Sequence, residues 1–421
     1  MMRMLFAGAA LAALAACNGA DTGAGAQMSG PAAPAGAAAS ISGAQAVDYG
    51  RADTSYQPAF AGQTRAPAPA RTHAWSVQTL ASDLDKAWSM EPLGDGRWLV
   101  AEKSGRLRLV TSGGRVMEPI TAGLPRVDAR GQGGLLDLAL SPDYARSGRI
   151  FFSYSEPREG GNGTAVATGI LRPNGLNVSL SDVRTIWRMQ PTLDSTLHYG
   201  SRLVFDREGR LLIALGERSI LPGRAQAQDP NSHFGKVVRI NADGSIPADN
   251  PYRNRAGAKA DIYAIGIRNI QSADLHPRTG ELWEVEHGPK GGDELNRILP
   301  GRDYGWPTIS YGVEYRGGAI GRGITQAPGM EQPLYYWDPV IAPSGMTFYS
   351  GALFPAWREN IFLGGLRSQG LVRLVLDGNR VVGEERIPLG ARIRDVKQGA
   401  DGALYALTDE DNGRILRIAP R

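Results

Sequence analysis

The sequence predicts an all-β protein, a six-bladed β-propeller of four-stranded antiparallel blades, and three observations support this prediction. Short alternating apolar runs recur along residues 72–421, and helical periodicity is nearly absent. Asp-Gly, Asn-Gly and Gly-Gly pairs separate the runs and supply the positive φ that hairpin turns need. Six of the runs are of one type, which a two-sheet sandwich does not explain, and their spacing suits propeller blades with loop insertions.

Each of the six runs is introduced by a turn, and their first residues are Gly96, Gly148, Gly209, Gly280, Asn360 and Gly402. A second alternating run follows at Gly105–Val110 and at Gly413–Ile418. The 55 glycines and 27 prolines then have a mechanical explanation in the turns. Propellers commonly bind ligands at the mouth of the central channel, so we expect a site there.

Residues 1–16 are predicted to be a lipoprotein signal peptide. Arg3 gives a positive start, and the apolar run that follows is shorter than the roughly 20 residues of a membrane span. Leu14-Ala-Ala-Cys17 resembles a lipobox, whose cysteine is lipidated; an ordinary signal peptide with an incidental cysteine is the alternative. Cys17 is the only cysteine, which excludes an internal disulfide.

Residues 17–71 are predicted to be the lipidated cysteine and a flexible tether rich in Ala, Gly and Pro, because they lack any sustained apolar period. Tyr56 and Phe60 are the contacts expected where the tether lies along the domain. The net charge of +4 is small and the basic residues are scattered, which argues against a nucleic-acid partner. We expect an exported, periplasmic protein attached to the membrane through the lipid only, in the outer membrane because Asn18 follows the cysteine.

His198 is the strongest candidate for a catalytic base. It lies between a polar segment and a strand, and a histidine near neutral pKa is suited to accepting a proton. A structural histidine bonded to the backbone is the alternative. His233 and His276 have no comparable context, and we interpret them as structural.

Four arginines suggest a ligand with several carboxylates. Arg268, followed by Asn269, ends the apolar run that starts at Ile262, and a guanidinium can bind two oxygens at once. Arg392 and Arg394 alternate on one strand face, where two like charges need an anionic partner. That partner is either a ligand or an Asp or Glu of a neighbouring strand. Arg367 is the fourth candidate, and an ordinary salt bridge is the alternative for Arg268.

The loop that starts at Gly288-Pro289 and reaches Glu294 offers backbone carbonyls and carboxylates within a few residues. Hard oxygen ligands of this kind suit calcium better than zinc or iron. A solvated acidic turn is the alternative. Gln132 lies in a glycine-rich turn that could approach a ligand, but no Lys-Ser/Thr follows it, so it is not a phosphate loop.

From about Trp75 to Arg421 the chain resembles the soluble quinoprotein sugar dehydrogenases, in particular the bacterial aldose sugar dehydrogenases that use pyrroloquinoline quinone (PQQ). The order and coverage of several short motifs make the resemblance specific. These motifs begin at Gly131 (GQGGLLD), His198 (HYGSRL), Gly235 (GKVVRI), Asp243 (DGSIPADNP), Gly266 (GIRN), Glu286 (EHGP), Asp303 (DYGWP), Ala342 (APSG) and Arg392 (RIRD).

The resemblance implies a six-bladed propeller that oxidises aldose sugars to lactones with PQQ and Ca²⁺. His198 would be the general base for the anomeric hydroxyl, with hydride transfer to the quinone, and Arg268 would stabilise charge on the quinone oxygen. Ca²⁺ would be bound by the carbonyls of Gly288 and Pro289, and a second calcium site would use Glu294 and Tyr304. The remaining cofactor contacts implied are Gln132, Asn269, Arg367, Arg392 and Arg394.

Three departures from the glucose-oxidising members bear on specificity. Arg367 stands where those members commonly have Lys, and Glu217 stands where they have Asp. The loops after Trp306 and Trp337 are short. We therefore expect a more open sugar site and a monomer, with electrons passing to a quinone or another periplasmic acceptor. The competing hypotheses are a metal-dependent lactonase, with acidic and Asn ligands on one central metal, and a non-catalytic propeller that binds a sugar or a protein.

Overall fold

The computed structural model of the chain describes residues 47–70 and 72–421. The predicted signal peptide, Cys17 and the tether up to residue 46 lie outside the described residues, as does residue 71. No helix in the described part of the chain has the length and apolar character that a membrane crossing requires.

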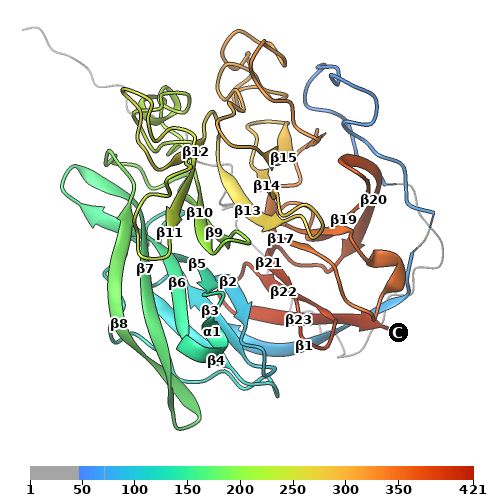
Figure 1. Cartoon of the computed structure of the whole chain (residues 1–421). Helices are drawn as coiled ribbons and strands as arrows, with labels where there is room; N and C mark the ends of the chain where they lie inside the picture. Colours follow the sequence, from blue (N-terminus) through green and yellow to red (C-terminus); the bar gives the residue numbers. More distant parts are fainter. Residues whose placement is uncertain (1–46, 71) are drawn as a thin grey trace, which may run out of the picture. The chain divides into compact units, whose positions relative to one another are not determined.

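Six antiparallel sheets follow one another around a central axis, which confirms the predicted six-bladed propeller (Figure 1). In each sheet, strands that are neighbours in sequence are mostly neighbours in space, as hairpin connections require. The first three blades contain β2 (Ala87–Pro92), β3 (Trp98–Glu102) and β4 (Arg106–Val110); β5 (Leu135–Leu140), β6 (Arg149–Arg158), β7 (Gly161–Asn174) and β8 (Asn177–Arg188); and β9 (Gly200–Phe205), β10 (Arg210–Leu215), β11 (Val237–Asn241) and β12 (Ile262–Ala264).

The last three blades complete the circle, and the sixth takes its outer strand from the N-terminal side of the propeller. This exchange closes the ring, since β1 pairs with the last strand of the chain. The strands are β13 (Ile270–Leu275), β14 (Leu282–Glu286), β15 (Asp293–Ile298) and β16 (Tyr335–Trp337); β17 (Pro343–Phe348), β18 (Ile361–Gly365), β19 (Gly370–Asp377) and β20 (Arg380–Pro388); and β21 (Ile393–Gln398), β22 (Leu404–Thr408), β23 (Gly413–Pro420) and β1 (Trp75–Leu84).

The first blade has three strands and a bridged segment in the place of a fourth. Leu107 and Ile120 exchange backbone hydrogen bonds of 3.0 and 2.8 Å, and Met117 donates one to Leu109. Helical structure among the described residues is limited to single turns at α1 (Tyr144–Ser147), α2 (Leu221–Arg224) and η1 (Pro355–Trp357).

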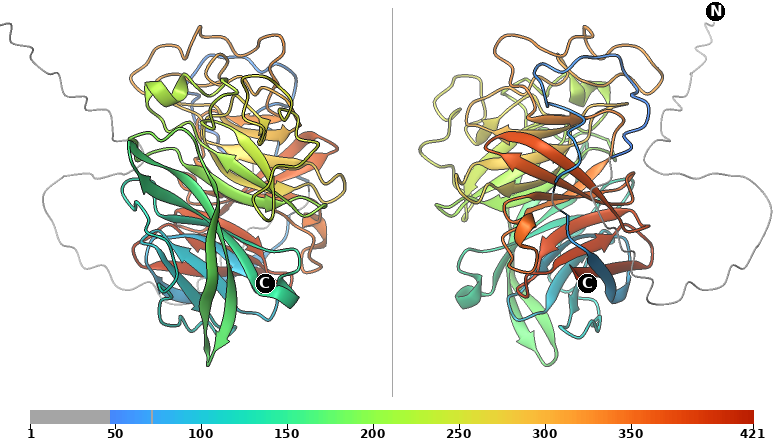
Figure 2. Two further views of the ribbon diagram at one scale, coloured as in Figure 1. Left: turned by 60° about the vertical axis from the view of Figure 1, so that its left-hand side comes forward. Right: turned by 90° about the vertical axis from the view of Figure 1, so that its right-hand side faces the viewer.

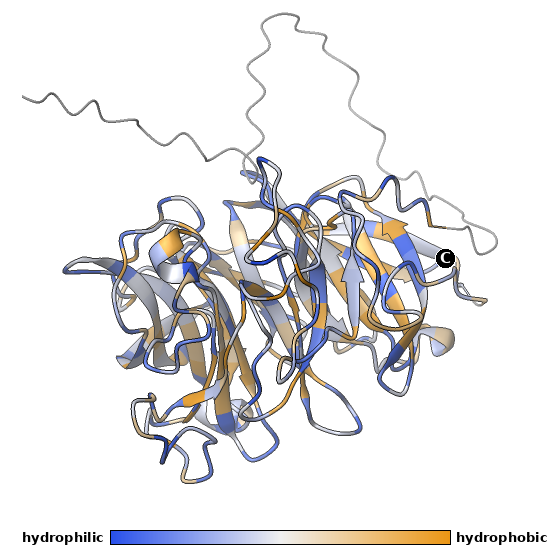
Figure 3. Ribbon diagram, turned by 90° about the horizontal axis from the view of Figure 1, so that it is seen from above, coloured by the Kyte–Doolittle hydropathy of each residue, from blue (hydrophilic) through white to orange (hydrophobic). Residues whose placement is uncertain are grey.

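Most of the core lies in six large apolar clusters, each between two neighbouring blades, and two clusters of three residues each lie apart from them. Strand β10 shows why: Leu211 and Ile213 pack toward the second blade, whereas Leu212 and Ala214 pack toward the fourth. Alternate residues of a central strand therefore face different clusters, as the two-residue period of a strand dictates. Figure 3 shows the apolar residues concentrated on the strands and the hydrophilic ones in the loops.

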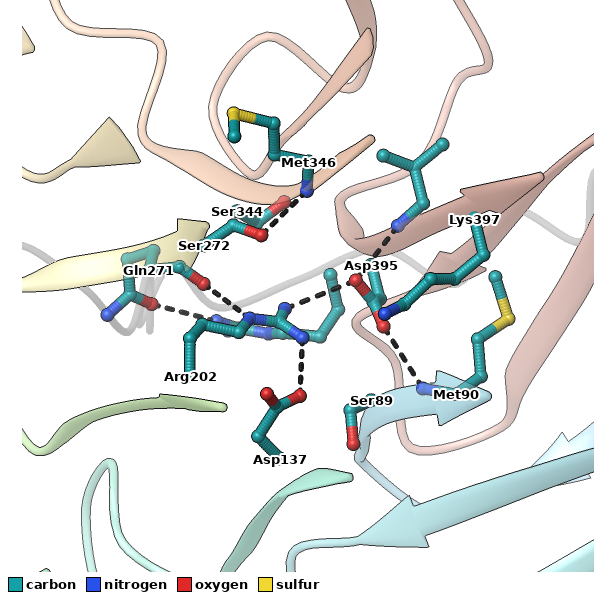
Figure 4. A network of polar contacts seen from close by, with 12 residues as sticks. Ser89, Met90, Asp137, Arg202, Gln271, Ser272, Ser344, Met346, Asp395 and Lys397 are labelled. Carbon is teal, nitrogen blue, oxygen red and sulfur yellow. Dashed lines mark hydrogen bonds and ion pairs between the residues drawn. The ribbon is translucent and has the colours of Figure 1, made fainter. Parts of the chain in front are cut away.

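The innermost strands of the six blades are linked to one another by hydrogen bonds from side chains to backbone (Figure 4). Each bond crosses from one blade to the next, and together they form a closed ring around the axis. The bonds are Ser89 Oγ to Leu136 O, Leu203 N to Asp137 Oδ2, Arg202 Nε to Gln271 O, Met346 N to Ser272 Oγ, Ser344 Oγ to Ile393 O, and Met90 N to Asp395 Oδ2.

Candidate active site

One face of the propeller collects the residues that the sequence singled out. In an antiparallel sheet, the start of the innermost strand lies beside the end of the second strand. Gly200 is thus opposite Leu215, and Ile270 is opposite Glu286. The loops that enter the innermost strands and the loops that leave the second strands therefore meet at the same edge in every blade.

His198 enters this face just before β9. Its φ is 46°, and its side chain is 7% exposed. Its backbone N–H donates a hydrogen bond of 2.8 Å to Oε1 of Gln132. On the ring, Nδ1 lies 3.0 Å from Oε2 of Glu217, which is fully buried after β10. Gln132 thus fixes the backbone of the histidine, and Glu217 fixes its ring.

The electrostatics of this pair favour a neutral imidazole facing a carboxylate. Burial lowers the pKa of His198, and the Glu217 charge, which favours the protonated ring, offsets this only in part. Burial acts to raise the pKa of Glu217, but the interaction with His198, including its hydrogen bond, and the charge of Arg268 outweigh it and the pKa is lowered. With an ionised Glu217 accepting from Nδ1–H, the lone pair of the ring lies on Nε2.

Arg268 and Asn269 precede β13, where both backbone N–H groups donate to Oε2 of Glu286, at 2.6 and 3.0 Å. The sequence predicts that Arg268 ends a strand, but β12 stops at Ala264. Gly266 has a φ of 77° and leaves the strand conformation, so Arg268 lies in the connection between two blades.

Two buried donors in this connection have no partner within the described residues, namely Nε of Arg268 and Nδ2 of Asn269. The amide of Asn269 is oriented by Gly200, whose N–H donates to Oδ1 at 3.2 Å. A buried donor without an acceptor costs about 1–3 kcal/mol. A ligand with oxygen acceptors would satisfy both donors.

The predicted calcium loop leads from β14 to β15. The N–H of Gly288 donates to Oδ1 of Asp293 at 2.9 Å, and Oδ2 of Asp293 accepts from Ile341 and Ala342 at 2.8 and 2.7 Å. The carboxylate of Asp293 therefore stabilises the loop through these three hydrogen bonds. Gly288 and Pro289 line a small cavity next to it, and Arg268, Glu294 and Tyr304 line the same cavity.

Three acidic residues lie next to this loop on one face of β14 and β15. Glu286 pairs with Glu294 across the strands, and Asn296 donates to both, at 3.4 and 3.3 Å. Glu284 is fully buried, and neither of its carboxylate oxygens has a hydrogen-bond donor among the residues that the structure describes. Burial and the charge of Glu286 raise its pKa well above the ordinary value. This donor-poor, oxygen-rich environment fits a hard cation.

No three His, Cys, Asp or Glu side chains within residues 47–70 and 72–421 are arranged to hold a metal ion. A calcium site here has to rely on backbone carbonyls, as predicted for Gly288 and Pro289. The lactonase hypothesis gains no support, because it requires acidic ligands that converge on one metal.

The rim arginines already have a protein partner. Arg392 donates to Oδ2 of Asp409 at 3.0 and 2.7 Å, and Arg394 donates to Oδ1 at 3.1 Å from two nitrogens. The sequence leaves two alternatives open for the anionic partner of these arginines, a ligand or an acidic residue of a neighbouring strand. The structure shows the acidic residue, Asp409. Arg367, between β18 and β19, is exposed, and no side-chain partner for it is found in the described part of the chain.

Several residues at this face are absent from the sequence-based set. The guanidinium of Arg268 lies over the ring of Trp306, with Cζ 5.3 Å from the ring centroid. The hydroxyl of Tyr315 is 3.5 Å from Nη2 of the same arginine. Trp306 and Tyr315 both belong to the long connection between β15 and β16. Trp306 is part of the motif that begins at Asp303, whereas no motif or strand pattern signals Tyr315. Lys103 donates to the carbonyl of Gly131 at 2.7 Å, and burial lowers its pKa to about 8.

The sequence matches the family model described as Glucose / Sorbosone dehydrogenase over residues 84–417. The "Aldose sugar dehydrogenase YliI" of Escherichia coli (strain K12) is 42% identical over 351 residues, which cover 82% of this chain and 93% of the relative.

Two solved structures resemble the fold closely. The soluble aldose sugar dehydrogenase from Escherichia coli in the apo-form has a TM-score of 0.77 at 41% identity, covering 82% of this chain and all of that one. The PQQ-bound form of aldose sugar dehydrogenase from Streptomyces coelicolor has a TM-score of 0.66 at 25% identity, over 82% and 99% of the two chains.

Proposed function

Because the chain belongs to the glucose/sorbosone dehydrogenase family, we propose that it is a sugar oxidoreductase that oxidises aldoses to lactones with PQQ and calcium. One observation carries the proposal: the buried pair of His198 and Glu217 shares one face of the propeller with two donors that lack partners in the described part of the chain, and with a loop whose Gly288 and Pro289 line a cavity. A base, a site for oxygen acceptors and a cation site are thereby adjacent.

In this proposal His198 removes the proton from the anomeric hydroxyl of the sugar. Nε2 accepts the proton, because Nδ1 is engaged by Glu217. The imidazolium that forms is stabilised by the ionised Glu217, which is buried with it. The hydrogen bond from the His198 backbone to Gln132 keeps the ring at the start of β9 during the transfer.

When bound, PQQ would supply the acceptor for the hydride, and Ca²⁺ would supply Lewis acidity beside it. Arg268 and Asn269 are suited to binding its oxygens through the donors that lack partners. Arg268 is further fixed by a bond of 2.6 Å from Nη1 to the carbonyl of His287, which orients the guanidinium beside the loop. Gln132, Arg367, Arg392 and Arg394 are proposed as outer contacts of the cofactor.

Calcium is proposed to bind the carbonyls of Gly288 and Pro289, with Glu294 and Tyr304 at a second position. Glu294 and Tyr304 line the same cavity as the loop, which supports their involvement. The lining residues include carboxylates and backbone carbonyls, which are the oxygen ligands that calcium prefers.

The proposal is tested by dye reduction with the purified protein, with and without PQQ and Ca²⁺, over a panel of aldoses. We expect turnover only when both are added. No turnover, and no quinone absorbance after desalting, would favour the non-catalytic binding propeller instead.

The sharpest test of the mechanism is His198→Ala. We expect this variant to retain PQQ, as judged by absorbance, and to lose about 10²–10⁴-fold in kcat, the usual contribution of a general base. His233→Ala is the matched control: this histidine lies 3.0 Å from Asp261, and it is predicted to be structural. Normal turnover in His198→Ala contradicts the assigned role.

The cellular setting remains a prediction. We propose export, lipidation at Cys17 and retention on the periplasmic side of the outer membrane, with the lipid as the only membrane attachment. A monomer would pass its electrons to a quinone or another periplasmic acceptor.

A further inference from the structure

Residues 47–67, termed the strap below, precede the region that matches the family model. The strap contains no regular secondary structure, yet it lies along the fourth and fifth blades (Figure 2, right). Its best-buried residues are Gln63 and Ala66, at 0% and 2% exposure, whereas Phe60 is 42% exposed. The side chains that the strap buries most deeply are therefore a polar one and a small one, and not that of the aromatic Phe60.

The first anchor of the strap is Asp338, which follows β16 and is 7% exposed. Its Oδ1 accepts from the N–H of Asp53 at 2.7 Å. Its Oδ2 accepts from the N–H and the Oγ1 of Thr54, at 3.0 and 2.6 Å. Arg65 donates to the carbonyl of Asp338 at 2.8 Å. One buried carboxylate thus receives three hydrogen bonds from two consecutive strap residues.

This anchor packs directly on the predicted calcium loop. A Cβ placed on Gly291 would lie 3.0 Å from Oδ1 of Asp338 and 3.3 Å from the methyl carbon of Thr54. The next residue, Gly292, donates its N–H to the carbonyl of Trp337 at 2.9 Å. The backbone of the loop is therefore packed against Asp338 and Thr54, the residues that attach the strap.

The second anchor, Gln63, contacts a segment that packs against the loop. Its side chain accepts from the hydroxyl of Tyr311 at 3.1 Å and donates to the carbonyl of Pro333 at 2.9 Å. Tyr311 is followed by Gly312, on which a Cβ would lie 2.7 Å from Cγ of Pro289. Pro289 is thus backed by a segment that the strap also fixes.

A loop with glycine at positions 288, 291 and 292 loses more conformational entropy on ordering than one made of other residues. Gly291 and Gly292 have φ values of 81° and 72°. Binding of an ion by backbone carbonyls costs conformational entropy if the loop has to be ordered at the same time. Contacts that orient the carbonyls before the ion binds lower this entropic cost.

We propose that the strap holds the 288–293 loop in its calcium-binding conformation, so that Thr54 and Asp338 are positioning residues for the metal. The inference rests on the proposed function, since it assumes that the loop binds calcium. It extends the site to a segment of the chain that precedes the matched region and lacks any ligand residue of its own.

The test compares Ca²⁺ affinity in full-length variants loaded with PQQ, by competition with a fluorescent calcium chelator. Asp338→Asn keeps the side-chain size but faces the three donors with an amide, and we expect about tenfold weaker binding, as for other outer-shell partners of metals. Thr54→Val loses one of three bonds, and we expect a smaller effect of about threefold. Ser55→Ala, at an exposed neighbouring position, is the matched control and should bind as the unsubstituted protein does.

The double variant Thr54→Val/Asp338→Asn should be no weaker than Asp338→Asn alone, because both changes break the same contact. A second readout uses metal-free protein: amide exchange at 290–292 should be faster in Asp338→Asn than in Ser55→Ala. Equal affinity in all the variants, or equal exchange, would overturn the proposal. Failure of the unsubstituted protein to bind Ca²⁺ would instead contradict the proposed function, on which the strap inference depends.

Discussion

The sequence identifies Glu217 as a residue of interest but does not predict its role at the site. Because the side chain of Glu217 is longer than that of the Asp in the glucose-oxidising members, the sequence predicts a change in sugar contacts. In the structure its carboxylate lies against Nδ1 of His198 and also accepts from the N–H of Ser219. Nineteen residues separate Glu217 from His198, and they meet because β9 and β10 are antiparallel. Only the fold brings the base and its orienting group together.

Replacing Glu217 with Gln should therefore reduce turnover without removing the cofactor. The amide cannot stabilise a protonated imidazole as a carboxylate does, so we expect kcat to fall by about 10²-fold; the orienting carboxylate of the serine-protease triad contributes up to about 10⁴-fold. PQQ binding, followed by absorbance, should be unchanged. Glu217→Asp keeps the charge and is the control expected to retain more activity than the Gln variant.

The pH profile separates this role from simple loss of structure. Activity requires neutral His198, so it falls as pH drops through the pKa of the ring, which burial already lowers. Removing the Glu217 charge, which raises that pKa, should move the acid limb of kcat to still lower pH. An unmoved acid limb would mean that Glu217 does not act on His198.

Much of the candidate site follows from short motifs, but the pairings within it do not. His198, Arg268 and Gly288 were identified from the residues themselves and lie on one face. The sequence leaves the partner of Arg392 and Arg394 open, because Asp409 follows a different strand, β22. The orphaned oxygens of Glu284 also escaped notice, since nothing in a sequence signals that a carboxylate lacks donors.

At the scale of elements, the six runs, five of them led by glycine and one by Asn360, correspond to the second strand of each blade, β3, β6, β10, β14, β18 and β22. These strands are flanked by a strand on both sides, so their side chains are mostly buried and the apolar pattern is strong. The outer strands are harder to predict. β12 and β16 have three residues each, too few to show a period.

A glycine at the end of β10 shows how tightly these elements meet at the site. A Cβ on Gly216 would collide with the carbonyl of His198 and lie 2.7 Å from Oδ1 of Asn269. Gly216→Ala should push the base and the cofactor contact apart. A misplacement of about 1 Å costs roughly 10²-fold in rate, so we expect a loss of that order in kcat/KM.

The control for this variant is Gly113→Ala, where an added Cβ meets no atom within 4 Å. Both proteins should remain folded by circular dichroism, with Gly113→Ala fully active. Activity of Gly216→Ala equal to that of the control would show that the contact between the two loops does not limit catalysis.

At the scale of the whole molecule, the ring of inter-blade bonds contains a buried ionic centre. Arg202 lies 2.7 Å from Oδ1 of Asp137 and 3.2 Å from Oδ1 of Asp395, and all three are at most 3% exposed (Figure 4). The ring also touches the site: Gln271 accepts from Arg202 through its carbonyl and from Arg394 through Oε1, at 3.4 Å. Gln271 thus connects the hydrogen bonds between the blades with Arg394 at the rim of the site.

This centre predicts that Arg202→Met will be strongly destabilising. Methionine preserves the apolar contact with Trp88, over whose ring the guanidinium lies at 4.4 Å, but it removes the ion-pair partner of the buried Asp137 and Asp395. The cation that remains near them is Lys397, which is itself paired with Glu91. Breaking a buried ion pair in this way costs about 3–5 kcal/mol. Urea unfolding followed by tryptophan fluorescence measures the loss. Arg417→Met is the control, because its pair with Asp401 is 30% and 40% exposed and should contribute under about 1 kcal/mol.

The pH dependence of this loss identifies its cause. Burial already raises the pKa of Asp137, and without Arg202 the pKa should rise further. A group whose pKa is higher in the folded state binds its proton on folding, so the cost vanishes below its unfolded pKa and grows as pH rises. The destabilisation by Arg202→Met should therefore shrink between pH 7 and pH 4. A constant loss over this range would indicate that Arg202 acts through packing on Trp88, and that the ring does not depend on its charge.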